Sequence, residues 1–112
     1  MDEKIRQIEG EITARGLRVG IVAARFNDFI VDRLVDAAVG ILLDHGAEPA
    51  DLLTVRVPGA FEIPVTVKKM ATSKRFDAIL ALGCVIRGAT PHFDYVAGEA
   101  SRGLANLCLE YE

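Results

Sequence analysis

The 112-residue chain has little of several features that mark particular classes of protein. It has no tryptophan and only two cysteines, and its 13 basic residues are outnumbered by 16 acidic ones, which gives a net charge of −3. Because no basic stripe is present, nucleic acid is not expected as a partner. The first residues form no apolar signal-peptide core, and no apolar run is long enough to span a membrane. We therefore expect a cytoplasmic protein without a membrane segment.

The two cysteines, Cys84 and Cys108, do not match the spacing of a zinc or redox motif. Both lie in apolar patterns, so we expect them to be reduced residues of the core, as in a reducing compartment. Gly-x-Gly-x-x-Gly and Walker sequences are also missing, which argues against dinucleotides and nucleoside triphosphates as ligands.

What the chain does have is apolar periodicity, with 51% hydrophobic residues and an ordinary 26% of charged ones. This length and composition predict a single domain over residues 1–112. Residues 1–16 have only a sparse apolar pattern and are interpreted as an extended arm that needs a partner surface, or as a frayed terminus. The expected strands are 17–24, 52–57 and 78–86, and the expected helices are 29–45, 61–73 and 91–111.

Three consecutive strand–helix units predict an α/β fold. Such alternation is typical of a parallel sheet with right-handed crossovers. We expect a three-layer sandwich in which helices cover both faces of a flavodoxin-like sheet. The nearly unbroken apolar run 78–86 further predicts a strand that is buried on both faces.

The loops that follow the three strands carry the candidate site. In a parallel sheet they share one edge, where α/β proteins bind their ligands. The first loop holds Phe26 and Asn27, the second contains residues 58–62, and the third leads to His92. A stacking ring, an amide, the carboxylate of Glu62 and an imidazole would therefore meet, which favours a small-molecule site.

The third loop opens a helix in a way that suits an anionic substrate. Thr90 is the expected N-cap, Pro91 fits the first helical position, and His92 falls in the first turn. Free N–H groups at a helix start attract anions, and an imidazole can move a proton.

Each of these side chains also has a purely structural interpretation. Phe26 can be a core aromatic that covers the helix end, and Asn27 can be only an N-cap. Glu62 can be a first-turn carboxylate that the helix dipole favours. His92 can be a solvated residue of the first turn.

Three blocks of the sequence, at residues 20–27, 57–64 and 83–96, match a known family in the right order, and residues 8–10 fit as well. The chain resembles the lumazine synthases of riboflavin biosynthesis. The resemblance implies condensation of 5-amino-6-(ribitylamino)pyrimidinedione with 3,4-dihydroxy-2-butanone 4-phosphate to 6,7-dimethyl-8-ribityllumazine. It also implies that neither a metal nor an organic cofactor takes part.

The resemblance assigns roles to individual residues. Phe26 would stack on the pyrimidine, His92 would transfer protons, and Ala89 and Thr90 would offer N–H groups to the phosphate. The other substrate-binding residues would be Asn27, Ala60, Phe61, Glu62, Cys84, Val85 and Ile86.

The resemblance further implies a homo-oligomer, either a pentamer or a closed shell of pentamers, in which the arm adds to a neighbour's sheet. Family members continue with another strand and further helices, which bring an aromatic residue and a phosphate-binding arginine. Here the expectation is a domain without that part: a fragment, half of a split protein completed by a second polypeptide, or a chain whose gap another element of the assembly fills.

The alternative function is a catalytically weak subunit that acts as a scaffold or binds lumazine or flavin. The residues of the Glu62 and His92 loops argue against an unrelated FMN-binding module.

Overall fold

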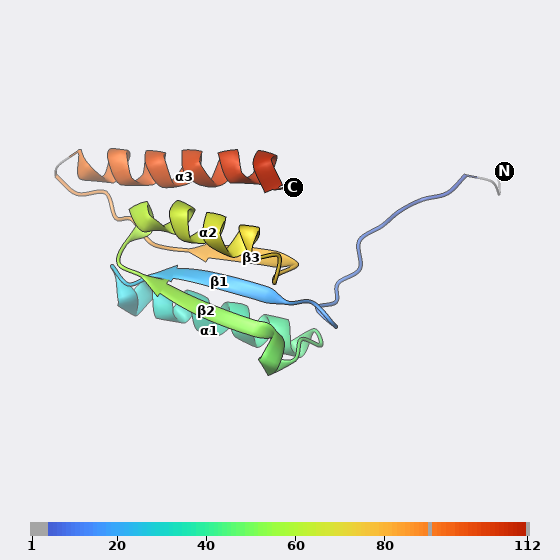
Figure 1. Cartoon of the computed structure of the whole chain (residues 1–112). Coiled ribbons are helices and arrows are strands. Elements are labelled where there is room, and N and C mark those ends of the chain that lie inside the picture. The colour runs from blue at the N-terminus through green and yellow to red at the C-terminus, as the bar shows by residue number, and fades with distance from the viewer. Residues whose placement is uncertain (1–4, 90, 112) are drawn as a thin grey trace.

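The structure is a computed structural model that describes residues 5–89 and 91–111 (Figure 1). Its three strands are β1 (Val19–Ala24), β2 (Leu52–Val57) and β3 (Ala78–Leu82). They run parallel in one sheet, in the order β2-β1-β3. Val19 pairs with Leu52 on one side and with Ala78 on the other, so the strands run in step. Their carboxyl ends therefore lie together, and the three following loops share one edge of the sheet.

Helices cover both faces of this sheet (Figure 1). α1 (Asp28–Asp44) lies on one face, while α2 (Ile63–Thr72) lies on the other with α3 (His92–Tyr111) against it. Two short 3₁₀ turns, η1 (Pro49–Asp51) and η2 (Ala60–Glu62), precede β2 and α2. The expected α/β, three-layer, flavodoxin-like fold class is confirmed.

The core is built around the central strand. All six residues of β1 are buried. Because successive strand residues point to opposite faces, Val22 and Ala24 join the apolar cluster beneath α2 and α3, whereas Ala23 packs on Val31 and Val35 of α1. Both layers of helices are thus held by the one strand from which the first site loop emerges.

The expectation for β3 was wrong in length and in burial. The strand ends at Leu82, and Ala78 and Ala81 are exposed. The last pair between β1 and β3 is Ala23–Leu82, and β1 ends one residue later at Ala24, so residues 84–86 have no strand beside them on that side. Within residues 5–89 and 91–111, no strand pairs with the outer edge of β3, and a groove of about 570 Å³ runs between β3, α2 and α3.

The two cysteines were also expected in the core, and neither is fully buried. Cys84 is half-buried and Cys108 is exposed, and both are free thiols. Cys108 lines the groove beside β3. Its place in an apolar pattern reflects the groove-facing side of α3 and not contact with the centre of the sheet.

An ion pair fixes the register at the edge of the sheet opposite the site loops. The backbone N–H of Arg18 donates to Asp77 Oδ2 at 2.9 Å, and its guanidinium donates to both carboxylate oxygens at 3.3 and 3.2 Å. The Asp77 N–H donates in return to the Arg18 carbonyl at 2.8 Å. The side-chain and backbone hydrogen bonds from Arg18 lower the pKa of the Asp77 carboxyl. This pair aligns the starts of β1 and β3.

Residues 5–13 leave the body of the domain as an extended segment (Figure 1). Ile5, Ile8 and Ile12 are all exposed along it. The segment is anchored where Ala14, which is buried, donates its N–H to the His45 carbonyl at 2.8 Å.

A glycine sets how closely α3 approaches α2. A Cβ at Gly103 would lie 2.7 and 2.8 Å from the Pro64 ring carbons Cβ and Cγ. α3 also contacts η2, which carries part of the second site loop. The close approach at Gly103 therefore helps to set where the first turn of α3 stands relative to that loop.

Candidate functional site

Hydrogen bonds from three consecutive residues tie the site loops together. The N–H of Arg25 donates to the Val57 carbonyl at 2.7 Å, and the N–H of Phe26 donates to the Pro58 carbonyl at 3.0 Å. Next in the chain, the side-chain Nδ2 of Asn27 donates to the Cys84 carbonyl at 2.8 Å. The loop after β1 is thus bound to the loops after β2 and β3.

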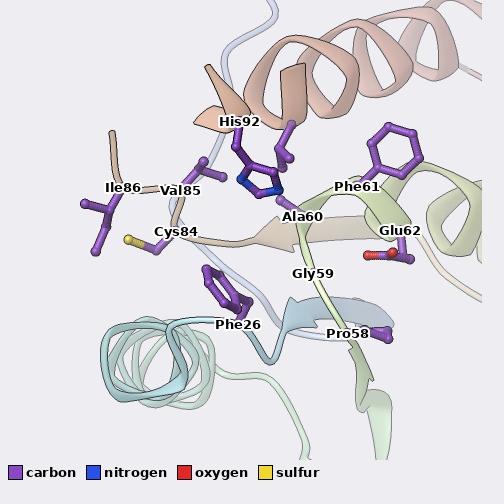
Figure 2. A pocket seen from close by; sticks show the side chains of 11 residues that line it. Phe26, Pro58, Gly59, Ala60, Phe61, Glu62, Cys84, Val85, Ile86 and His92 are labelled. Atoms are coloured by element: carbon purple, nitrogen blue, oxygen red, sulfur yellow. The ribbon is translucent and has the colours of Figure 1, made fainter. Parts of the chain in front are cut away.

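A cavity of about 310 Å³ opens where these loops meet the start of α3. Figure 2 shows the Phe26 ring on one side of it and the His92 imidazole on the opposite side. This volume is in the range of small-molecule sites. The lining residues are Phe26, Pro58, Gly59, Ala60, Phe61, Glu62, Cys84, Val85, Ile86, His92 and Val96.

Most of the residues singled out in the sequence are brought together here. Asn27 and Ala89 do not line the cavity, and Thr90 lies outside the described residues. Val96 was missed, although its signal was present: it stands four residues after His92, and side chains at that spacing share a helix face. Pro58 and Gly59 were recognised as loop residues but not as cavity lining.

Phe26 is not a core aromatic, because 66% of it is exposed. Phe61, in the second loop, is exposed to 59%. Two largely exposed rings at a cavity mouth give flat apolar faces to a planar ligand, and such a ligand would cover surface that water now wets.

Asn27 is the residue at the N-cap position of α1, but its side chain does not cap the helix. Its backbone is left-handed, with φ 63° and ψ 42°, and no side-chain cap hydrogen bond is made. The Asn27 carbonyl accepts the first bonds of the helix, from the N–H groups of Ile30 and Val31 at 3.0 and 3.1 Å. The side-chain amide of Asn27 therefore donates to the Cys84 carbonyl and not to the helix.

Glu62 ends η2 and directly precedes α2, where the positive end of the helix dipole favours a carboxylate. It makes no side-chain cap bond. Its Oε2 lies 3.2 Å from the point that a Cβ on Gly59 would occupy, so the carboxylate rests beside the backbone of the second loop (Figure 2). In this position it can accept hydrogen bonds from ligand hydroxyls.

His92 is the first residue of α3 and is exposed. The helix starts there because the Pro91 carbonyl accepts from the N–H groups of Asp94 and Tyr95 at 3.0 and 3.4 Å. One turn later, Val96 packs on the apolar cluster beneath α3 and fixes this end of the helix. The imidazole thus stands on a rigid element, and an imidazole can both accept and donate protons near neutral pH.

Within residues 5–89 and 91–111, no group of three or more His, Cys, Asp and Glu side chains is arranged to hold a metal ion. None of the helices in this part of the chain is long and apolar enough to cross a membrane.

The fold and the cavity define an α/β protein with a small-molecule site at the carboxyl edge of its parallel sheet, which is where open α/β folds bind ligands. The sequence profile of the 6,7-dimethyl-8-ribityllumazine synthase family matches residues 16–112. The chain belongs to this family of enzymes.

Relatives named 6,7-dimethyl-8-ribityllumazine synthase match over nearly the whole chain. The protein from Nitratidesulfovibrio vulgaris (strain Miyazaki F) is 58% identical over 106 residues, which are 95% of this chain and 68% of the relative. The protein from Desulfovibrio desulfuricans is 53% identical over 107 residues, 96% of this chain and 69% of the relative. The protein from Aquifex aeolicus is 56% identical over 102 residues, 91% of this chain and 66% of the relative.

Proposed function

We propose that this chain is a lumazine synthase subunit that condenses 5-amino-6-(ribitylamino)pyrimidinedione with 3,4-dihydroxy-2-butanone 4-phosphate to give 6,7-dimethyl-8-ribityllumazine. One observation carries the proposal. A single cavity joins an exposed aromatic ring, a carboxylate and an imidazole, in a chain that is 58% identical to a protein of that name.

In this proposal the cavity binds the pyrimidinedione first. Phe26 stacks on the ring, and the segment Cys84–Val85–Ile86 lines the pyrimidine pocket, largely through its backbone groups. Ala60, Phe61 and Glu62 hold the ring and the ribityl chain, with the Glu62 carboxylate accepting from ribityl hydroxyls. The N–H groups of Ala89 and Thr90 are assigned to the phosphate of the second substrate.

The reaction then needs proximity and proton transfer. An amine of the pyrimidinedione attacks the ketone, and loss of water gives an imine. A proton leaves carbon as phosphate departs, and the resulting enol takes up a proton on carbon to become a second carbonyl. The other amine attacks this carbonyl, and loss of a second water closes the ring. His92, across the cavity from Phe26 (Figure 2), accepts and returns these protons. Holding the two substrates together supplies much of the remaining acceleration.

The experiment is lumazine formation by the purified chain, compared between wild type, Phe26→Ala and Phe29→Ala. Loss of stacking on a heterocycle is expected to raise KM for the pyrimidinedione in Phe26→Ala by about 5-fold to 150-fold, which corresponds to about 1–3 kcal/mol per stacked ring. Phe29 is the matched control, because it is also exposed but lies under the Arg33 guanidinium at 4.6 Å on α1, outside the cavity lining.

Phe29→Ala should keep the wild-type KM. A wild-type chain that forms no lumazine would overturn the proposed function. A Phe26→Ala variant with an unchanged KM would leave the function standing but would remove the stacking role.

We also propose that residues 1–112 act as one domain whose arm, residues 1–16, joins it to further copies in the cytoplasm, as a pentamer or a larger shell. The exposed Ile5, Ile8 and Ile12 support this, because apolar side chains in a row on an extended segment need a partner surface. Light scattering should give five or more chain masses. A chain that stays monomeric until a second polypeptide is added would contradict self-assembly and favour a two-chain enzyme.

A further inference from the structure

We propose that Asn27 is a positioning residue, which holds the Cys84–Val85–Ile86 segment against the loop of Phe26 and so shapes the ligand cavity without lining it. The inference rests on the proposed function for the identity of the ligand. It differs from the expectation drawn from the family resemblance, in which Asn27 binds the substrate itself.

The three hydrogen bonds that join the loops differ in the kind of donor they use. Arg25 and Phe26 use their backbone N–H groups, which almost any residue could supply. The third bond comes from a side chain, since Asn27 Nδ2 donates to the half-buried Cys84 carbonyl at 2.8 Å. Within this set, only the bond to the third loop depends on which amino acid is present.

The backbone of Asn27 also suits asparagine. Its φ of 63° and ψ of 42° are in the left-handed region, which asparagine adopts more readily than most residues. This turn reverses the chain between β1 and α1. It also leaves the amide without a cap bond to the helix, free to reach a carbonyl 57 residues away. Asparagine satisfies both needs of the position, the turn and the donor.

Few polar contacts hold the partner segment: Cys84 and Val85 pack on the two apolar clusters, and the Arg87 guanidinium lies 5.8 Å from the centre of the Phe93 ring. β3 ends at Leu82, so residues 84–89 lie outside the sheet ladder. Within the described part of the chain, no other hydrogen bond joins residues 84–89 to another segment. Val85 and Ile86 nevertheless line the cavity. Among the described residues, the Asn27 bond is therefore the hydrogen bond that holds this wall of the cavity against the Phe26 loop. A wall that is ordered before the ligand arrives lowers the free-energy cost of binding.

Two variants separate the amide from the turn. Asn27→Gly keeps the left-handed backbone without strain but removes the donor. Asn27→Asp keeps the shape but places carboxylate oxygens beside the Cys84 carbonyl oxygen, which has no proton to donate to them. The control is Asn106→Asp, which makes the same charge change at an exposed position on α3 outside the cavity.

The first measurement is the affinity for 6,7-dimethyl-8-ribityllumazine by titration calorimetry, with thermal unfolding followed in parallel. We expect the Kd to rise about tenfold in Asn27→Gly and further in Asn27→Asp, with Tm lowered only slightly. The second measurement is hydrogen exchange of the backbone amides of residues 84–88 without ligand. Exchange should be faster in both Asn27 variants and unchanged in Asn106→Asp.

The outcomes distinguish this inference from the proposed function. If the wild-type chain does not bind the lumazine, the proposed function fails, and the exchange rates alone then decide whether Asn27 holds the loop. If the wild-type chain binds but Asn27→Gly binds equally well, or if exchange in residues 84–88 is unchanged, the positioning role is wrong. A lowered Tm with an unchanged Kd would indicate a structural role only.

Discussion

His92→Ala is expected to lower kcat for lumazine formation by about 100-fold, at the low end of what a positioned acid–base group usually contributes. The effect should not be larger, because both substrates would still be held together in the cavity and water can carry protons in a site this open. His92 is exposed at the start of α3, so its removal creates no void in the core. KM for the pyrimidinedione and the mass of the assembly should therefore stay close to their wild-type values.

The chain supplies a matched control in its other histidine. The Nδ1 of His45 lies 2.8 Å from the Ile41 carbonyl at the end of α1, away from the cavity. His45→Ala should keep the wild-type kcat. Added imidazole should restore part of the activity of His92→Ala, because the vacated position is open to solvent. A His92→Ala enzyme that works at the wild-type rate would exclude the proton-transfer role.

Gly103→Ala is expected to destabilise the fold, although alanine is the better helix former. Its Cβ would lie 2.7 Å from a ring carbon of Pro64, and a proline ring cannot rotate aside. Overpacking of this kind costs about 1–3 kcal/mol, against a gain of about 1 kcal/mol in helix propensity. The net loss corresponds to a fall in Tm of about 4 °C for each kcal/mol. Because α3 would move away from α2, the position of His92 and therefore kcat should suffer as well.

Gly98→Ala in the same helix is the control, because a Cβ there has nothing within 4 Å. It should raise the free energy of unfolding by about 0.5–1 kcal/mol, the usual gain when alanine replaces a mid-helix glycine. Thermal unfolding of the two variants should thus give Tm shifts of opposite sign. Shifts in the same direction would show that α2 and α3 are not packed as closely as the Gly103–Pro64 contact requires.

The features that sequence patterns predicted well are those set by local chemistry. Residues 52–57 form a strand with the expected bounds, because turn-forming residues lie on both sides of a short, mainly apolar segment that contains three β-branched residues. α1 was expected over 29–45 and spans Asp28–Asp44, since its apolar spacing and the glycine that follows it are both local signals. The convergence of the three loops followed from parallel topology alone.

The features that the sequence could not predict depend on distant partners. The apolar run 78–86 looks like one strand, but pairing stops at Leu82, and the neighbouring strand itself ends one residue beyond the last pair. Asn27 fits a cap, a ligand contact or a loop bond equally well by local pattern, and its acceptor is 57 residues away. Cys108 has the apolar surroundings of a core residue but lies in a groove at the edge of the sheet.

The position of β3 has a consequence for how the cavity responds to its ligand. β1 is paired on both sides, whereas β3 is paired on one side only within the described residues. Opening an edge strand breaks fewer hydrogen bonds than opening a central one, so we expect the half of the cavity built on β3 to open more readily than the half built on β1. A ligand that contacts both halves favours the state in which β3 is paired with β1. Its observed affinity therefore depends partly on how readily β3 pairs with β1. Substitutions far from the cavity that loosen this strand would then weaken binding without touching any group that contacts the ligand.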